Sequence, residues 1–444
     1  MHSFDRSDEV FEFAGFRFDP LGGLERDGRA IHLAPLEHRA LGVLLNARGR
    51  IVDKDAFAQA AWKGGAPSDY SIARCIHLLR RALAQPEEPE VIETFHGRGY
   101  RVAVPVRERP AEQAPAASGP SGPGGMLADD ALRAARELVG RRTPGELASA
   151  VAVLTEAAAR EPRNASVIAM IAEVRVLQAV RRYLPPRKLA PTIRESANAA
   201  LALDRQNAWA YAARGWASAL VGWDYASGLA DVDRALALDP RYVRGRNMRW
   251  WILSGLGRND DALTECLSAA ESSPLSPWLP SPLAWSYATV GEVGRGLDVM
   301  RDATGRFPSL DMVFMFRCLL AAISGEHGEA IDAGEKAMSL SQGSTLAMAA
   351  LAYAFARAGR DEEARMVVRW IGETELGAPP SLLVPVHVAL GDNPAALAWL
   401  EKAVGEHCPW LALVESDPRN APLRSRPEFI RLATAHRTRV AVAS

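Results

Sequence analysis

Five tyrosine, arginine and histidine side chains recur along one short stretch of the chain, between Pro67 and Pro86. They are Tyr70, Arg74, His77, Arg80 and Arg81. Between Asp69 and Pro86 the sequence contains no acidic residue, so nothing within that stretch neutralises the arginines. Guanidinium and imidazole groups can hydrogen bond to base edges and pair with phosphates. The stretch therefore has the side-chain chemistry needed to contact a nucleic acid.

An apolar repeat predicts that these side chains project from a helix. The apolar residues of the stretch recur at helical spacing: Ile72, Ile76, Leu79 and Leu83. At about 100° per residue, the polar and basic side chains then fall on the opposite face, with Arg80 on its flank. We therefore expect a helix with one buried apolar face and one cationic outer face.

A second basic element follows this helix. The alternating residues 91–95 and 100–104 predict two strands, and the His-Gly-Arg-Gly sequence of residues 96–99 predicts a tight turn between them. Arg98 lies in this turn and Arg101 on the second strand. Helix plus basic hairpin is the layout of a winged helix, whose helix enters the major groove while the hairpin reaches the backbone or minor groove. A solvated helix face beside an ordinary hairpin fits the spacing equally well.

Further segments accompany the helix. They are FEFAGFRFD from Phe11, HLAPLEHRALGVLLNARGRIVDKDAFAQAAW from His32, the Leu-Arg-x-x-Leu motif that ends at Leu83, and HGRGYRV from His96. Together these segments resemble the OmpR/PhoB-type winged-helix effector domain, over residues 11–104. The resemblance implies a small antiparallel sheet ahead of the helices. It also implies that the recognition helix contacts bases and phosphates, and that the wing adds a further cation. The residues concerned are Arg74, His77, Arg80 and Arg81 in the helix and Arg98 in the wing.

Charge limits how such a domain can attract DNA. The chain of 444 residues has a net charge of −1, and residues 1–110 contain 16 Lys+Arg and 16 Asp+Glu. Any electrostatic attraction must therefore come from a local patch rather than from the domain as a whole.

Cysteine spacing and hydropathy indicate the compartment. The four cysteines are far apart and form no CxxC pair, which fits a reducing compartment and argues against a disulfide framework or a zinc site. The first residues are polar and acidic, and the most apolar later run, residues 312–323, is interrupted by Arg317. We therefore expect a cytoplasmic protein without a membrane segment.

The rest of the chain is a linker followed by repeats. Residues 106–126 are rich in Pro, Gly, Ala and Ser, which predicts a mobile linker between a domain at 1–105 and a second domain at 127–440. In the second domain, three series of residues step by 34 positions. They are Pro240, Pro274 and Pro308; Gly228, Ala262, Gly296, Ala330 and Ala364; and Ala235, Ala269, Ala303 and Ala337. This period predicts two antiparallel helices per repeat, with small residues where the helices touch.

The repeats, visible in RALALDPRYVRGR and GRNDDALTECLSAAESSP, resemble the tetratricopeptide repeat. The fold class expected is an α+β winged helix-turn-helix followed by an all-α tetratricopeptide-repeat superhelix. We expect about seven or eight helical pairs in a right-handed superhelix with a concave groove. A unit near Gly391 falls two residues short of register, and residues 417–429 are expected to cap the last repeat.

The repeat domain offers one candidate binding group. The register points Arg244, Asn247 and Trp251 toward the concave side, where an Arg-Asn pair could hold a carboxylate or phosphate of a partner peptide. A solvated helix face is the alternative interpretation. The sequence contains no Gly-Lys pair for a P-loop, no HExxH and no GxSxG, so we expect neither an enzyme nor a cofactor or metal site.

Together these features favour a cytoplasmic regulator of transcription. Its winged helix would bind double-stranded promoter DNA, and its repeats would receive a protein, peptide or small-molecule signal or drive self-association. The arrangement resembles bacterial regulators of the HilA type. Because the winged helix begins almost at Met1, no receiver domain is expected ahead of it, and control would act through the repeats or through abundance. The alternative is a scaffold whose winged helix, with Cys75 and Leu78 in place of polar contacts, docks a protein.

Overall fold

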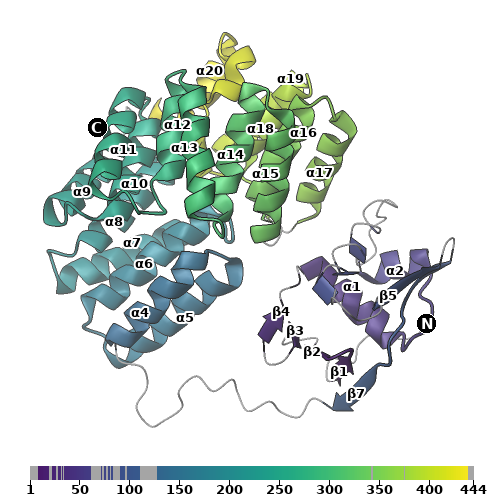
Figure 1. Cartoon of the computed structure of the whole chain (residues 1–444). Coiled ribbons are helices and arrows are strands. Elements are labelled where there is room, and N and C mark those ends of the chain that lie inside the picture. The colour runs from purple at the N-terminus through teal and green to yellow at the C-terminus, as the bar shows by residue number, and fades with distance from the viewer. Residues whose placement is uncertain are drawn as a thin grey trace. The chain divides into compact units, whose positions relative to one another are not determined.

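The computed structural model describes residues 9–19, 23–26, 29–31, 33, 35–61, 72, 75–76, 79–80, 82–83, 91–95, 98–110, 128–341, 344–374 and 376–438. The chain divides into two compact units, Met1–Ser121 and Gly122–Ser444 (Figure 1). Each unit buries its own apolar side chains. Tyr70, Arg74, His77, Leu78 and Arg81 lie outside the described residues.

The first unit opens with an antiparallel sheet. Its strand order is β4-β3-β2-β1-β7, formed by Arg29–Ile31, Gly23–Arg26, Phe16–Asp19, Glu9–Phe13 and Arg107–Pro110. Alternate phenylalanines of β1 and β2 point into the core, because successive side chains of a strand face opposite sides of the sheet. Phe11 and Phe18 are paired across the two strands and are each 1% exposed. The predicted small sheet ahead of the helices is confirmed.

Strand β7 differs from the sequence-based expectation for the linker. The composition predicts that residues 107–110 belong to the linker, but they pair with β1, with Phe11 opposite Glu108. This strand lies at the edge of the sheet, where charged residues and proline are tolerated because one side of the backbone needs no partner. Its Arg-Glu-Arg-Pro sequence therefore has no apolar alternation from which to predict a strand.

The helices of the first unit support a two-stranded hairpin. Helix α1 spans Pro35–Asn46 and α2 spans Lys54–Ala61, and the hairpin consists of β5 (Ile92–Phe95) and β6 (Gly99–Val102). The Asp53 carboxylate accepts a hydrogen bond from the Ala56 backbone amide at 2.8 Å and caps α2. Phe57 is fully buried, and its ring centre lies 5.6 Å from that of Tyr100 in β6. The predicted hairpin strands are confirmed.

Gly99 is required by a close backbone approach as well as by its conformation. Its φ is +128°, and a Cβ placed there would lie 1.9 Å from the Val52 carbonyl oxygen. The Val52 and Tyr100 backbones exchange hydrogen bonds of 2.8 and 2.9 Å. The start of β6 is thus fixed against the segment that precedes α2.

The second unit contains eight helical pairs within the described residues (Figure 1). The first helices are α4 (Ala128–Arg141), α6 (Ala165–Val180), α8 (Ala208–Leu220), α10 (Val243–Gly255), α12 (Pro280–Thr289), α14 (Asp311–Ser324), α16 (Thr345–Arg357) and α18 (Pro380–Ala389). The second helices are α5 (Pro144–Arg160), α7 (Pro186–Leu203), α9 (Tyr225–Leu238), α11 (Asn259–Ser272), α13 (Val293–Arg306), α15 (His327–Leu340), α17 (Asp361–Glu373) and α19 (Asn393–Gly405). Helices α9, α11, α13, α15 and α17 begin 34 residues apart, and α19 begins two residues early, as predicted.

The small residues of the repeat lie where the helices of a pair touch. A Cβ added to Gly228 of α9 would lie 2.6 Å from the Ala219 Cβ of α8, and one added to Gly296 of α13 would lie 2.5 Å from the Ala284 carbonyl oxygen of α12. Ala262 and Ala330, at the equivalent positions, are 2% and 0% exposed. The predicted role of this series, which is close approach of paired helices, is confirmed.

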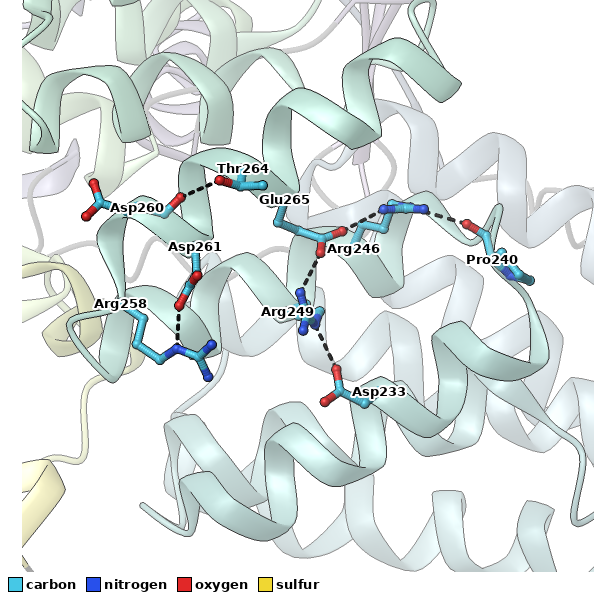
Figure 2. A network of polar contacts seen from close by, with 9 residues as sticks. All are labelled: Asp233, Pro240, Arg246, Arg249, Arg258, Asp260, Asp261, Thr264 and Glu265. Atoms are coloured by element: carbon cyan, nitrogen blue, oxygen red, sulfur yellow. Dashed lines mark hydrogen bonds and ion pairs between the residues drawn. The ribbon is translucent and has the colours of Figure 1, made fainter.

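Ion pairs connect helices of neighbouring repeats. Glu265 of α11 accepts bonds from Arg246 at 2.8 Å and from Arg249 at 2.6 Å, both on α10. Arg249 also forms an ion pair with Asp233 of α9 at 2.7 Å. A chain of charged residues therefore joins α9, α10 and α11 (Figure 2). The Glu265 side chain is only 8% exposed, which makes its two partners important for stability.

The carboxyl-terminal segment contacts helices far from it in sequence. It comprises η1 (Pro409–Leu413), η2 (Pro418–Leu423), α20 (Pro427–Ala433) and α21 (Ala435–Thr438). Helix α20 contacts α19, as expected of a cap. However, η1 also contacts α6, α10 and α18, which are all first helices of their pairs. The segment therefore does more than cap the last repeat, because its apolar residues are buried against the inner helices of the array.

Three further properties hold for the part of the chain that the structure describes. None of its helices is both long and apolar enough to cross a membrane. No group of three or more His, Cys, Asp or Glu side chains in it could hold a metal ion. All four cysteines are buried free thiols.

Candidate functional sites

The buried face of the predicted recognition helix is as expected. Ile72, Ile76, Leu79 and Leu83 are each at most 2% exposed and belong to the core of the first unit. Cys75 lies on this buried face as well, 1% exposed, and burial raises the pKa of its thiol. This position therefore faces the protein interior, and a cysteine there does not replace an exposed polar contact.

Arg80 connects this helix to the hairpin. Its Nε and Nη2 donate to the Ile92 carbonyl oxygen at 3.0 and 2.8 Å, and Nη2 also donates to the Thr94 hydroxyl at 2.8 Å. Both acceptors belong to β5. The half-buried guanidinium thus sets the position of the wing relative to the helix.

The two arginines of the hairpin have different surroundings. Arg101 pairs with Glu93 directly across the strands, at 2.8 Å, and its guanidinium lies 4.8 Å from the centre of the Phe95 ring. Arg98 is exposed at the hairpin tip, and its side chain makes no ion pair with any described residue. Of the two, Arg98 therefore offers the cation that is less neutralised by its own domain.

The second unit contains a cavity of about 80 Å³ inside the helical array. Arg244, Asn247 and Trp251, the three residues that the repeat register predicted to share a face, all line it. The rest of the wall is largely apolar, with several aromatic rings. Its aromatic members are Trp216, Trp250, Trp278, Phe316 and Trp410.

The three predicted residues are held in place by neighbouring repeats. Arg244 pairs with the Glu173 carboxylate of α6 at 3.3 Å, and its guanidinium lies 5.1 Å from the centre of the Trp278 ring. Asn247 donates to the Trp278 carbonyl oxygen at 3.4 Å. Trp251 is 5% exposed and packs edge to face against Trp410 of η1, with ring centres 5.0 Å apart. The predicted solvated helix face is therefore not what the structure shows.

Two arginines that the sequence analysis did not single out complete the cavity. Arg142 is 6% exposed, and its guanidinium carbon lies 3.7 Å from the centre of the Trp278 ring. Arg181 is 4% exposed, pairs with Asp311 of α14 and donates to the Tyr183 hydroxyl at 3.1 Å. Neither residue belongs to the series of residues that recur every 34 positions. A signal that could have pointed to them is the Arg181-Arg182 pair at the end of α6, just before the Leu184-Pro185-Pro186 insertion.

Burial and like charges act together on these arginines. Burial lowers the pKa of Arg142 to about 9; the positive charges of Arg181 and Arg244 also lower it, and Asp311 raises it. Burial opposes the charged form of Arg181 too, but Asp311 and Tyr183 together outweigh this effect and raise the pKa of Arg181. Burial raises the pKa of Glu173, against the effect of Arg244. Among the described residues, Arg142 is thus the cavity arginine without a carboxylate partner.

The architecture of the first unit defines a winged-helix domain: a small sheet, a helix with a buried stripe, and a hairpin fixed to it. Residues 28–102 match the family described as "Transcriptional regulatory protein, C terminal". The amino-terminal domain therefore belongs to this family of regulators, in its OmpR/PhoB-type form.

Relatives share this domain. The chain is 36% identical over 100 residues to the transcriptional regulator HilA of Salmonella typhi. This alignment covers 22% of this chain and 18% of HilA. It is also 36% identical over 95 residues to the transcriptional regulatory protein CutR of Streptomyces coelicolor, which covers 21% of this chain and 42% of CutR. The chain thus aligns with about a fifth of the length of the HilA regulators.

Solved structures resemble the helical part. The APC/C hetero-tetramer Cut9-Hcn1 matches with a TM-score of 0.48 and 15% identity, over 67% of this chain and 55% of that chain. A thermophilic tetratricopeptide-repeat protein of Thermus thermophilus matches with a TM-score of 0.35 and 18% identity, over 41% of this chain and 92% of that chain. The helical pairs and their 34-residue period are those of a tetratricopeptide-repeat-like array.

Proposed function

We propose that the protein is a DNA-binding regulator of transcription that acts in the cytoplasm. The observation that carries this proposal is the family match of residues 28–102, together with a wing whose tip exposes Arg98. Tyr70, Arg74, His77 and Arg81 are proposed to face DNA from the recognition helix, because the apolar residues of the same stretch are buried. Arg80 is proposed to hold the wing in position and also to contact DNA beside the wing. Arg101 is proposed to contact DNA beside Arg98.

The test is footprinting and gel-shift measurement with the full-length chain on fragments of its own genome. A regulator protects defined sites. Arg74→Ala or His77→Ala is expected to cost about 1–3 kcal/mol of specific binding if the side chain reads a base. Arg98→Ala and Arg81→Ala are expected to weaken binding to all sequences alike and to reduce the salt slope by about one. Arg295→Ala, which removes an exposed charge from the helical unit, is the matched control.

Two outcomes would contradict this proposal. Absence of any protected fragment would favour the scaffold, in which the winged helix docks a protein. Equal affinity of the wild type and an Arg74→Ala/Arg81→Ala variant would remove the recognition helix from the interface.

The helical unit is proposed to receive the signal, as a protein, peptide or small molecule. The support is the cavity, which brings Arg244, Asn247 and Trp251 together inside the array. The proposal assigns no catalytic step to the chain. Self-association through the repeats stays a prediction, which sedimentation of the full-length chain with and without DNA would check.

A further inference from the structure

Two buried guanidinium groups in the cavity each have one nitrogen without a hydrogen-bond acceptor among the described residues. Arg142 Nε and Arg181 Nη1 are both buried and have no partner among the described residues. Both residues line the cavity and are more than nine-tenths buried. Leaving charged donors buried without acceptors is costly, so native structures nearly always supply a partner. The cavity therefore has the donors of a site without an acceptor from the protein.

The charges around the cavity indicate the charge that a ligand would carry. Asp311 forms an ion pair with Arg181. Glu173 forms an ion pair with Arg244 and accepts a hydrogen bond from the Tyr242 hydroxyl. Three guanidinium groups thus face two carboxylates, and the excess charge lies on Arg142. A ligand with one negative charge would neutralise it. A dianion would exceed the positive charge available in a site from which most water is excluded.

The dimensions and walls of the cavity restrict the ligand further. An apolar cavity of about 150 Å³ accommodates the six heavy atoms of benzene, so one of about 80 Å³ suits a ligand of only a few heavy atoms. The wall combines guanidinium groups with indole rings and the side chains of Val180 and Met312. A carboxylate accepts paired hydrogen bonds from guanidinium groups, and a short alkyl group suits the aromatic wall.

We propose that the cavity between α6, α10 and α12 is a binding site for a small monocarboxylate, of the size of acetate or propionate. The carboxylate accepts hydrogen bonds from the guanidinium groups of Arg142 and Arg181, and the alkyl group packs against the tryptophans. This inference rests on the proposed signal-receiving role of the helical unit, but binding is measured without DNA, so the two can fail separately.

The same geometry connects the ligand to the carboxyl-terminal segment. Trp410 of η1 forms part of the cavity wall, and its Nε1 donates to the Val180 carbonyl oxygen of α6 at 2.9 Å. An occupant of the cavity is therefore in reach of η1. Binding is expected to slow hydrogen exchange in residues 409–414, because it adds contacts to a segment that packs against α6, α10 and α18.

The experiment is a titration of the full-length protein with sodium propionate against sodium chloride at equal ionic strength. Tryptophan fluorescence, calorimetry and the melting temperature are the readouts, since five indoles line the cavity. Propionate is expected to change the fluorescence saturably and to raise the melting temperature, while chloride does neither. For the five heavy atoms of propionate, the affinity is expected to be no tighter than about 3 μM.

Variants of Arg142 separate binding from folding. Arg142→Met keeps the stem over Trp278 but removes the charge, so propionate binding is expected to weaken at least about tenfold. The melting temperature without propionate is expected to stay equal or to rise, because a buried charge without a carboxylate partner is removed. Arg142→Lys keeps the charge and is expected to retain part of the binding. The matched control is Arg136→Met, whose guanidinium lies 5.2 Å from the centre of the Trp209 ring, outside the cavity.

Several outcomes would overturn the inference. One is a wild-type protein that shows no saturable response up to about 20 mM propionate. Another is equal binding by the wild type and Arg142→Met, which would place the ligand elsewhere. Saturable binding of inorganic phosphate in preference to propionate would show that the site is built for a different anion. If Arg142→Met does not fold, the comparison of Arg142→Lys with Arg136→Met still decides whether the guanidinium fork is needed.

Discussion

The Arg80 guanidinium donates two hydrogen bonds to the Ile92 carbonyl oxygen, at 3.0 and 2.8 Å, and so links the recognition helix to the first strand of the wing. Hydrogen bonds that involve a charged group are stronger than neutral ones and hold their partners more firmly. The position of Arg98 at the far end of the hairpin therefore depends on a residue that belongs to the helix. Helix and wing therefore form one unit, as the proposed binding of DNA by both elements requires.

Arg80→Met is expected to release this link without emptying the core. The predicted cost is about 1–3 kcal/mol, because charge-assisted hydrogen bonds to Ile92 and Thr94 are lost. Hydrogen exchange of the β5 amides in the full-length chain should become faster, and affinity for every DNA sequence should fall alike. Unchanged exchange in β5 would show that the link is dispensable. The helical unit provides the internal control, since its exchange should not change.

Gly99→Ala is expected to disrupt the hairpin severely. The new Cβ would lie 1.9 Å from the Val52 carbonyl oxygen, so backbone must move, and a cost of at least about 3 kcal/mol is expected. Gly23→Ala is the matched control: Gly23 also has positive φ, +100°, but nothing lies within 4 Å of the added Cβ. Unfolding of the first unit, followed by denaturant titration, should therefore be affected much more by the first change. Equal effects would mean that conformation alone matters at Gly99.

Glu265→Gln tests the ion pairs that join α9, α10 and α11 (Figure 2). Glu265 bridges Arg246 and Arg249 while nearly buried, so its neutralisation is expected to lower the free energy of unfolding by about 2–3 kcal/mol. Asp261→Asn removes the pair with Arg258, in which both side chains are about half exposed, and is expected to cost less than about 0.5 kcal/mol. Urea unfolding of the helical unit measures both. A similar cost for the two variants would contradict the role of burial.

The sequence predicts these features unequally, for physical reasons. The buried stripe of Ile72 to Leu83 and the 34-residue repeat follow from local periodicity, because each residue's face is set by its own helix. The same register brought Arg244 and Asn247 to one cavity. Arg181 and its partner Asp311 are 130 residues apart and lie outside the repeat series, so only the folded array brings them together. The pairing of β7 with β1 is equally non-local.

Acid is expected to weaken the carboxyl-terminal segment through His436. Its Nε2 contacts the Gly255 carbonyl oxygen at 3.0 Å, and burial lowers the pKa of His436 to about 4; the charge of Arg437 lowers it as well, and hydrogen bonds to backbone carbonyls raise it. In the unfolded chain the pKa is about 6.5, so between about pH 6.5 and 4 the unfolded chain binds a proton that the folded protein does not. The stability contributed by neutral His436 is therefore complete above about pH 6.5 and falls as the pH is lowered, by at most roughly 3 kcal/mol.

The measurement is urea unfolding of the wild type and of His436→Gln between about pH 7 and pH 4. Glutamine keeps a donor for the Gly255 carbonyl oxygen but does not titrate in this range. The difference in unfolding free energy between the two proteins should therefore shift in favour of the variant as the pH falls, which removes the effect of all shared groups. A difference that stays constant would show that His436 is protonated in the folded protein too.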